Sequence, residues 1–462
     1  MNNQREKLGS RLGFILLSAG CAIGLGNVWK FPWLVGENGG AFFVLIYLLF
    51  LVAMGIPIMT MEFAVGRAAQ KSPARMYHAV TPEKKGWRIH GYASVVGIVM
   101  LMMFYTMVAG WMLYYFVETI KGTFVPLNAE EIGGVFGGLV GSWDTMTIYM
   151  AIVTIGCFAI LSIGLQKGLE RVTKYMMLAL LAIMVFLAVY NIAQPGGVEG
   201  LKFYLVPNVE SFMADPINVI VSAMNQSFFT LSIGIGSMAI FGSYINRDRA
   251  LFGEALNVAI LDTFVALTAG LIIFPACFSF GIQPDAGPNL IFVTLPNVFN
   301  QMGPVVGRVV GAFFFLFLSF AAISTVLAVF EAIIACFSDM LGWTRKKACV
   351  LCCIIMLVLA MPCILGFNVL SNVNLMGVPG KNIMDFEDFI VSNCLLPLGS
   401  LVFVLYCTWS KKGWGWKNFT EEANAGKGLK VPSWLFGYCK YVLPVIIVFL
   451  FLFGIYGIFF AG

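Results

Sequence analysis

The sequence predicts an all-α polytopic membrane protein, and three observations support this fold class. Hydrophobic residues make up 60% of the 462 residues and charged residues only 11%, with a mean hydropathy of +0.90. Apolar runs of about 20 residues, the length that a helix needs to cross a bilayer, recur along the whole chain. The runs are continuous rather than alternating, which excludes a β-barrel, and the composition excludes an ordinary soluble domain.

Eleven apolar runs are long enough to be spans. They cover residues 11–36, 40–66, 89–118, 146–165, 169–192, 217–243, 251–280, 305–338, 346–368, 386–409 and 441–460. The N-terminus and every second loop hold 23 of the 28 lysines and arginines, and such loops are cytoplasmic as a rule. We therefore predict a cytoplasmic N-terminus and, from the odd number of spans, an extracytoplasmic C-terminus. No cleavage site follows the first run, so we expect a retained helix rather than a signal peptide.

The rest of the composition argues against several functions. The eleven cysteines lie almost all in apolar runs without metal-site spacing, so we interpret them as small core residues. The two histidines, His78 and His90, fall in one charged loop, which argues against a histidine-based catalytic or metal site. An enzyme would need a nucleophile with a base, or a metal cluster, and the sequence offers neither. Topology explains the net charge of +5, so we expect no nucleic-acid partner.

Glycine pairs interrupt two of the spans. Gly24 and Gly26 lie in the first, AGCAIGLGNVWKFP, and Gly234 and Gly236 in the sixth. One interrupted span thus opens each group of five, as an inverted repeat of five plus five helices requires. Paired interruptions of this kind indicate the central site of a transporter. Close helix packing is the alternative explanation for the glycines alone.

This pattern divides the chain into six segments. They are a cytoplasmic N-terminal segment (1–10), a first five-helix repeat (11–195), an extracellular loop (196–216), a second five-helix repeat (217–411), a cytoplasmic loop (412–440) and an eleventh helix (441–462).

The ends of interrupted helices can bind ions of both signs. Free N–H groups suit a carboxylate and free carbonyls suit a desolvated cation, so an amino acid bound together with sodium would use both. Asn27 lies beside the first break, and Thr230 and Ser232 lie at the second.

The seventh and eighth spans add polar groups. On the eighth, the spacing of Ala321, Ser324 and Thr325 places two hydroxyls and a carbonyl on one face, which suits Na⁺. The alternative is that these hydroxyls bond to their own helix or to a neighbouring one. Asp262 on the seventh span is a candidate ion ligand or proton carrier. Glu62 and Glu331 are interpreted as structural or gating groups.

Five segments together resemble the neurotransmitter:sodium symporter family over nearly the whole chain. They are RLGFILLSAGCAIGLGNVWKFP, ENGGAFFVLIYLL and GIPIMTMEFAVGR for the first two helices, FFTLSIGIG for the sixth and FAAIST for the eighth. The resemblance implies a LeuT-type 5+5 inverted repeat with discontinuous helices 1 and 6, plus an eleventh helix. Because many bacterial members also lack a twelfth helix, we expect a multi-pass protein of a bacterial inner (plasma) membrane.

The resemblance also implies two sodium sites and no organic cofactor. The first site would use the carbonyl of Ala22, the side chains of Asn27, Thr230 and Asp262, and the substrate carboxylate. The second would use the carbonyls of Gly20, Ile23 and Ala321 and the hydroxyls of Ser324 and Thr325.

The amino-acid substrate would lie between the two breaks. The resemblance implies that its carboxylate meets the amides of Leu25 and Gly26 and the phenol of Tyr105. Its ammonium would face carbonyls around Ala22, Phe229 and Ser232. Its side-chain pocket would be lined by Leu101, Phe229, Ile235, Thr325 and Val329. Ile235 stands where some relatives have Phe, which favours a large hydrophobic or aromatic substrate such as tyrosine or tryptophan.

Asp262 departs from the family pattern, which usually has Asn there. In chloride-dependent members a bound chloride offsets the sodium charge, and Tyr47 and Gln226 fall at positions that resemble that site. Since Asp262 would supply a fixed negative charge instead, we predict chloride-independent transport. Protonation of Asp262 on the empty return step remains open.

The gates form a second point of departure. Lys30 replaces the usual Arg of the outer gate, and the family partner resembles Asp388, with Asp385 less favoured. Lysine lacks the bidentate fork of arginine, so we expect a looser gate. On the inner side, Arg5 and Asp339 resemble the cytoplasmic gate, with Tyr244 close by.

We therefore predict sodium-coupled symport of a zwitterionic hydrophobic amino acid into the cell by alternating access. A proton-coupled amino-acid permease that uses Asp262 is one alternative. An ion channel whose broken helices line a continuous pore is another.

Overall fold

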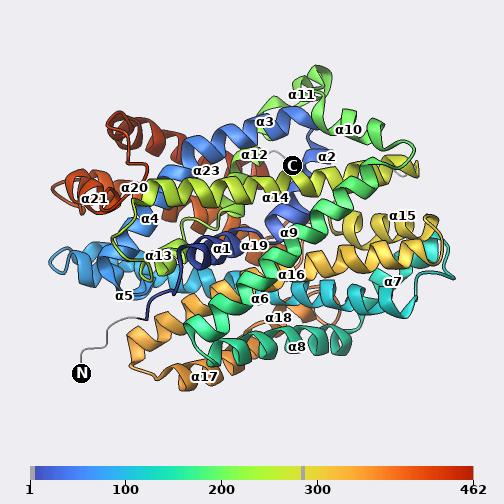
Figure 1. Ribbon diagram of the computed structural model, residues 1–462, viewed down its shortest axis with the longest axis horizontal. Helices are drawn as coiled ribbons and strands as arrows, with labels where there is room; N and C mark the ends of the chain where they lie inside the picture. The colour runs from blue at the N-terminus through green and yellow to red at the C-terminus, as the bar shows by residue number, and fades with distance from the viewer. Residues whose placement is uncertain (1–5, 282–286, 461–462) are drawn as a thin grey trace.

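The chain folds into a bundle of long helices, which cross the view from one end to the other in Figure 1. This computed structural model describes residues 6–281 and 287–460, without the side chains of residues 211 and 457–460. Within these ranges nine helical stretches are long and apolar enough to cross a membrane. They are Ala41–Ala69, Lys85–Lys121, Trp143–Ser162, Leu165–Ile192, Leu251–Ser279, Val306–Leu341, Arg345–Leu365, Ile383–Thr408 and Leu435–Tyr456.

Three of these stretches are single helices: α8 (Trp143–Ser162), α14 (Leu251–Ser279) and α16 (Val306–Leu341). Three combine two segments: the 3-10 turn η3 (Lys85–Trp87) with α6 (Arg88–Lys121), the π-helical turn η4 (Leu165–Glu170) with α9 (Arg171–Ile192), and α17 (Arg345–Leu359) with α18 (Met361–Leu365). The other three contain a π-helical turn between two helices: α3 (Ala41–Phe50), η2 (Leu51–Gly55) and α4 (Ile56–Ala69); α19 (Ile383–Asp388), η6 (Phe389–Leu395) and α20 (Leu396–Thr408); and α22 (Leu435–Gly437), η7 (Tyr438–Val442) and α23 (Leu443–Phe460).

Two further segments are interrupted at the positions that the sequence predicts, and within the described residues only the first, with its two halves taken together, is long and apolar enough to cross a membrane. The first consists of α1 (Arg11–Ala22), a π-helical turn (Gly26–Lys30) and α2 (Phe31–Glu37), with a bend of 53° at the break. The other consists of α12 (Pro216–Thr230) and α13 (Ser237–Gly242), of 15 and 6 residues, each too short to cross a membrane alone. The count of eleven spans and the role of the last one stay predictions.

Short helices occupy the connecting segments at both ends of the bundle. Two of them, α5 (Pro73–Val80) and α21 (Trp416–Ala423), lie toward the left end in Figure 1. Toward the right end lie α7 (Ala129–Gly141), α10 (Gly197–Leu205), α11 (Val209–Ala214) and, after the π-helical turn η5 (Leu290–Thr294), α15 (Leu295–Gln301). The segment 196–216, predicted as a loop, is therefore largely helical, and the segment 412–440, also predicted as a loop, contains α21 and the first residues of the last helical stretch. Tertiary packing stabilises these helices: α10 packs on α14, and α21 packs on α4.

The broken helices are largely buried, and Figure 1 shows α1 near the centre of the view with α13 to its left. The long helix α16 packs against α6, α9 and α1, while α14 packs against α9 and α1. The backbones of α13 and α4 nearly touch, since a Cβ on Gly66 would lie 1.8 Å from the carbonyl oxygen of Ala239. Small residues permit this close approach, as they do in other membrane helix pairs.

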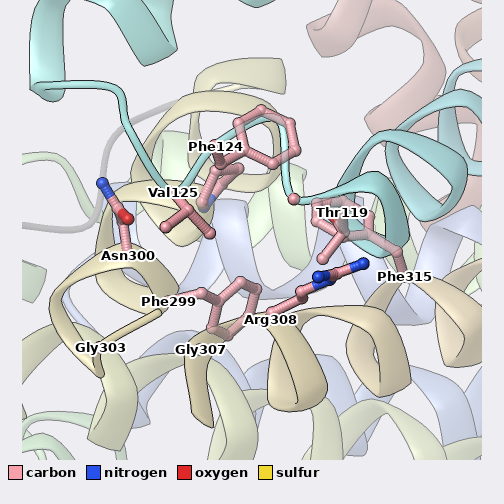
Figure 2. A pocket seen from close by; sticks show the side chains of 11 residues that line it. Thr119, Phe124, Val125, Phe299, Asn300, Gly303, Gly307, Arg308 and Phe315 are labelled. Atoms are coloured by element: carbon pink, nitrogen blue, oxygen red, sulfur yellow. The ribbon is translucent and has the colours of Figure 1, made fainter. Parts of the chain in front are cut away.

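A small cavity at the right-hand end of the bundle is unrelated to the breaks. Figure 2 shows its lining, which comes from the end of α6, the following loop, α15 and the start of α16. Its volume is only about 20 Å³. Asn300 Nδ2 donates to the Leu127 carbonyl at 2.7 Å, and Arg308 donates to the Ile120 carbonyl. These bonds fasten the connecting loop to α15 and the end of α6 to α16, and none of the predicted site residues lines the cavity.

Candidate substrate and sodium sites

The break in the first span follows from how closely α6 and α16 approach it. Regular helix ends at Ala22, and Ile23 adopts a non-helical conformation (φ −72°, ψ 89°). A Cβ on Gly24 would lie 2.1 Å from the Tyr105 hydroxyl and 2.5 Å from Thr325 Oγ1. Only glycine leaves room for both oxygens, so the backbone itself is exposed to the centre of the protein.

The break between α12 and α13 contains three residues in the left-handed region. Gly234 and Gly236 have φ of +99° and +76°, which glycine adopts without strain. Ser232 has φ of +51°, which is uncommon for a residue with a side chain. Its hydroxyl donates to the Cys21 carbonyl at 3.3 Å, so this unusual residue ties the second break to the end of α1.

Two buried side chains hold the unwound backbone at Gly234. Its N–H donates to Glu62 Oε1, and its carbonyl lies 3.1 Å from His90 Nε2. His90 Nδ1 in turn lies 2.7 Å from the Tyr77 hydroxyl on α5. With Nε2–H as the donor to the carbonyl, Nδ1 accepts the Tyr77 proton. The prediction that His90 lies in a charged loop is wrong: α6 begins at Arg88, and His90 is buried.

The side chains predicted for the first sodium site converge around Asp262. Asn27 Nδ2 lies 2.9 Å and Thr230 Oγ1 3.2 Å from Asp262 Oδ1, and Thr230 Oγ1 lies 3.0 Å from Asn27 Oδ1. The hydroxyl of Tyr47 lies 3.4 Å from Asp262 Oδ2. Ala22, the fourth predicted ligand, lines the adjacent central cavity.

Asp262 is fully buried, and no lysine or arginine in the described ranges forms an ion pair with it. A buried carboxylate without a cationic partner is costly in a membrane protein. The cluster of Asp262, Asn27 and Thr230 therefore has the charge and the oxygen donors that suit a small hard cation.

The five residues predicted for the second sodium site also converge. Thr325 Oγ1 lies 3.0 Å from the Gly20 carbonyl and 3.3 Å from the Ile23 carbonyl. Ser324 Oγ lies 3.2 Å from the Gly20 carbonyl and 2.9 Å from that of Ala321. The hydroxyls thus reach both their own helix and α1, so three carbonyls and two hydroxyls face one small volume.

Two of the three residues predicted to bind the substrate carboxylate, Leu25 and Tyr105, contact each other. The amide N–H of Leu25 donates to the Tyr105 hydroxyl at 2.8 Å. Gln226 Nε2 donates to the Gly26 carbonyl at 2.6 Å, and a Cβ on Gly26 would lie 3.0 Å from the Phe229 ring. The Tyr105 hydroxyl therefore accepts the hydrogen bond of the Leu25 amide, and a substrate carboxylate could accept the same bond in its place.

Two cavities meet at the rings of Tyr105 and Phe229. The central cavity is small, about 10 Å³. It is lined by Cys21, Ala22, Gly24, Gly26, Leu101, Tyr105, Phe229, Ser232, Thr325 and Leu396. The outer cavity, of about 280 Å³, is lined by both rings together with Leu25, Trp29 and Lys30 among others. Tyr105 and Phe229 thus separate the outer cavity from the central one.

Two predicted pocket residues lie elsewhere. Ile235 lines a different cavity, between α6 and α20, and Val329 is buried on α16 outside the linings of these cavities. Their role in the substrate pocket stays a prediction.

Lys30 and Asp388 face each other across the outer cavity. Lys30 Nζ lies 3.3 Å from Asp388 Oδ2 and 4.3 Å from the centre of the Phe229 ring. Asp388 Oδ1 also accepts from Ser392 at 2.6 Å, whereas Asp385 pairs with Lys381 at 3.4 Å. Lys30 therefore links the acid on α19 to the aromatic ring above the central cavity.

At the opposite end, only part of the predicted inner gate can be described. Arg5 lies outside the described residues, and Asp339 accepts the Ser72 amide at 2.7 Å. Tyr244 donates to Glu331 Oε1 at 2.7 Å, and Arg345 binds both oxygens of Glu331. The sequence analysis missed this role of Arg345, because the residue stands in a run of three basic residues at the start of α17.

Comparison with known proteins identifies the family. The model of the sodium:neurotransmitter symporter family matches residues 5–128 and 138–459. An uncharacterized sodium-dependent transporter of Bacillus subtilis (strain 168), YhdH, is 34% identical over 96% of this chain and 97% of its own length. The Drosophila melanogaster sodium-dependent serotonin transporter is 25% identical over 98% of this chain and 77% of its own length.

A solved structure agrees with this family. The crystal structure of MhsT in complex with L-phenylalanine matches with a TM-score of 0.87 and 37% identity, over 97% of this chain and 99% of MhsT. The LeuT-type fold is therefore confirmed. The family and the sodium-dependent transporters among its relatives confirm the prediction that the chain is not an enzyme. The chain is a sodium-dependent membrane transporter that belongs to the sodium:neurotransmitter symporter family.

Proposed function

We propose that this protein carries a zwitterionic amino acid with a large apolar or aromatic side chain into the cell, together with two Na⁺ ions. One observation carries the proposal: two clusters of oxygen ligands flank one central cavity, and Thr325 belongs to both the cavity and a cluster. The similarity to MhsT, crystallised with L-phenylalanine, supports the substrate class.

Binding would proceed from the outer cavity. The substrate carboxylate would displace the Tyr105 hydroxyl from the Leu25 amide and complete the first sodium site beside Asp262. Phe229 would then cover the substrate, with Lys30 and Asp388 closing the path above it. Inward movement of each Na⁺ supplies about 2.3 kcal/mol per 100 mV of membrane potential, before the concentration difference is added.

Substrate identity is tested by competition. A scintillation-proximity assay would measure displacement of radiolabelled L-phenylalanine from the purified protein by a panel of amino acids in Na⁺. We expect tyrosine, tryptophan and leucine to compete, and glycine, glutamate and lysine to fail. Stronger competition by glycine or by a charged amino acid would overturn the proposed substrate class.

Asp262 carries the proposal that transport needs no chloride. Its carboxylate contacts Asn27, Thr230 and Tyr47, where it would neutralise one Na⁺. Uptake into proteoliposomes should stay unchanged when gluconate replaces chloride, and Asp262→Asn should lose uptake or gain a chloride requirement. Loss of uptake by the unmodified protein when gluconate replaces chloride would refute chloride-independent transport.

The same carboxylate favours a second candidate, proton-coupled transport. In that case Asp262 would release its proton on the inner side in place of Na⁺. Uptake in Na⁺-free buffer, driven by a pH gradient alone, distinguishes this candidate from sodium coupling.

A further inference from the structure

Another cavity, whose lining includes none of the residues of the central and outer cavities, lies between the first turns of α6 and the segment η6–α20. Its volume is about 420 Å³, within the range of about 300–1,000 Å³ that is usual for small-molecule sites. The lining consists of Gly86, Trp87, Ile89, His90, Ala93, Ser94, Gly234, Ile235, Leu395, Leu398, Gly399 and Val402.

The exposed apolar residues that line this cavity lead us to infer that it opens toward lipid. Ile89 and Leu398 on its rim are 75% and 39% exposed, and both belong to stretches apolar enough to cross a membrane. Most of the lining is aliphatic, and the two histidine nitrogens already have partners in Gly234 and Tyr77. An apolar chain, rather than a polar solute, therefore suits the interior.

Basic residues adjoin the lining residues Gly86, Trp87 and Ile89 at the start of α6. Trp87 Nε1 donates to the Lys412 carbonyl at 2.7 Å, and Lys84 Nζ donates to the Gly413 carbonyl at 2.6 Å. These bonds bring two basic segments together, and their charged residues are Lys84, Lys85, Arg88, Lys411 and Lys412, against the single acid Glu83. Within the described ranges none of these five cations forms an ion pair.

We propose that this cavity binds one acyl chain of an anionic phospholipid, whose headgroup lies on Lys85, Arg88 and Lys412. Clusters of Lys and Arg at the membrane surface attract anionic headgroups, by about 1 kcal/mol per basic residue. Trp87 sits between the apolar interior and the basic end, as tryptophan does at membrane interfaces. The position of the charges and the apolar interior thus match the two parts of one lipid molecule.

The lipid would touch the transport machinery from behind. Gly234 and Ile235 belong to the break between α12 and α13, and they form part of the cavity wall. A Cβ on Gly97 would lie 2.9 Å from Ile235 Cγ2, so Ile235 is packed firmly between α6 and the cavity. An acyl chain in the cavity would therefore support the backbone of the second break, and we expect anionic lipid to increase the rate of transport.

Native mass spectrometry of the full chain in detergent tests the site directly. We expect the protein to retain one phosphatidylglycerol at a concentration at which phosphatidylcholine with the same acyl chains is lost. Ala93→Phe, which fills the cavity, should reduce this retention at least tenfold. Ile155→Phe, on the exposed face of α8, serves as the matched control and should retain the lipid.

A charge variant tests the headgroup contact. Replacing Lys85, Arg88 and Lys412 by Gln should remove the preference for phosphatidylglycerol over phosphatidylcholine. Replacing Lys167, Lys346 and Lys347 by Gln, three exposed residues outside the cavity, should leave it intact. Thermal unfolding of each variant in detergent shows that it is folded before retention is compared.

Three results would overturn the proposal. The first is retention of phosphatidylglycerol by Ala93→Phe that equals retention by the unmodified protein. The second is equal retention of phosphatidylglycerol and phosphatidylcholine by the unmodified protein. The third is a dimer mass that disappears in Ala93→Phe, since a second copy of the chain would then occupy the cavity. The assay contains neither Na⁺ nor amino acid. Its failure would therefore leave the proposed transport function unaffected, and failure of transport would leave the lipid result unaffected.

Discussion

Thr325 stands where three parts of the protein meet. Its hydroxyl lies within hydrogen-bond distance of the carbonyls of Gly20 and Ile23 on the first span, and Thr325 itself also lines the central cavity. In a membrane helix a threonine usually bonds only to its own preceding turn, as Thr60 does with the Ile56 carbonyl at 2.7 Å. The reach of Thr325 to another helix favours a ligand role.

Thr325→Val should weaken sodium binding while the protein stays folded. The change removes one oxygen ligand from the second proposed site at nearly constant volume, so we expect the Na⁺ affinity to fall roughly tenfold. Sodium titration of amino-acid binding measures this effect. Thr60→Val removes a hydroxyl that bonds only to its own helix and serves as the control; an equal shift in both variants would argue against a site at Thr325.

The outer gate can be tested by exchanging its charges. Lys30→Asp alone places two acids together and Asp388→Lys alone places two bases together, so each single change should reduce uptake strongly. The double variant restores an opposite pair across the 3.3 Å contact and should recover more uptake than either single change. Asp385→Lys, at the neighbouring acid that pairs with Lys381, is the control for a general charge effect. No recovery in the double variant would contradict the pairing.

The sequence predicted residues that act through short polar contacts better than residues that act through packing. Asn27, Thr230 and Asp262 are polar groups in apolar runs, so each stood out before their contacts were known. Ile235 did not, because nothing in an apolar residue's identity tells which cavity it faces. His90 was missed because a charged stretch just before it suggested a loop, whereas burial against Tyr77 places it inside α6.

At the scale of helices, the break after α1 is set by contacts rather than by weak helix propensity. Gly24→Ala should abolish uptake, since the added methyl would overlap the Tyr105 hydroxyl and Thr325 Oγ1. Amino-acid binding and uptake by folded, membrane-inserted protein are the measurements. Gly156→Ala on α8 is the matched control, because a Cβ there meets nothing within 4 Å, and it should transport normally. Normal uptake by Gly24→Ala would contradict the close packing described here.

A buried ion pair fastens α21 to α4. Arg67 contacts the Glu422 carboxylate at 2.6 Å, and both side chains are almost fully buried. Arg247 also contacts this carboxylate. Burial raises the pKa of Glu422, but the hydrogen bond from Arg247 and the charge of Arg67 outweigh it, so the pKa lies below its ordinary value.

Glu422→Gln should therefore destabilise the protein by about 3–5 kcal/mol, the usual effect of leaving one partner of a buried pair alone. Because the folded-state pKa is lowered, the contribution of Glu422 is present above the unfolded-state value of about 4.3 and is lost as the pH falls through the folded-state pKa. Thermal unfolding in detergent measures both effects when it is followed from about pH 7 down to about pH 3, which lies below the unfolded-state pKa of a glutamate. Glu421→Gln, at an exposed neighbour, should change the stability little. An equal loss of stability in both variants would contradict a stabilising role of the Arg67–Glu422 ion pair.

The long helices were predictable because length and hydropathy alone identify them. The short helices α10, α11 and α21 were not, because they are stabilised by packing on the bundle rather than by a strong pattern of their own. The segment 412–440 looked like a loop because it is polar, yet Phe419 and Glu422 of α21 are buried against the bundle. A polar helix of this kind becomes recognisable only once its buried face is known.

At the scale of the whole molecule, the outer and central cavities differ greatly in size. The outer cavity of about 280 Å³ ends at Tyr105 and Phe229, beyond which only about 10 Å³ remains. On the opposite side, Arg345 and Glu331 and the contacts of Asp339 hold the helix ends together. This arrangement suits a transporter whose substrate site is reached from one side at a time, and it does not suit a channel with a continuous pore.

We propose that sodium drives amino-acid uptake through the site between the two breaks. The most direct measurement is uptake of radiolabelled L-phenylalanine into proteoliposomes with an inward Na⁺ gradient and gluconate in place of chloride. We predict saturable uptake that disappears when choline replaces Na⁺. Uptake of equal size in choline, or a current that flows without any amino acid, would contradict the account.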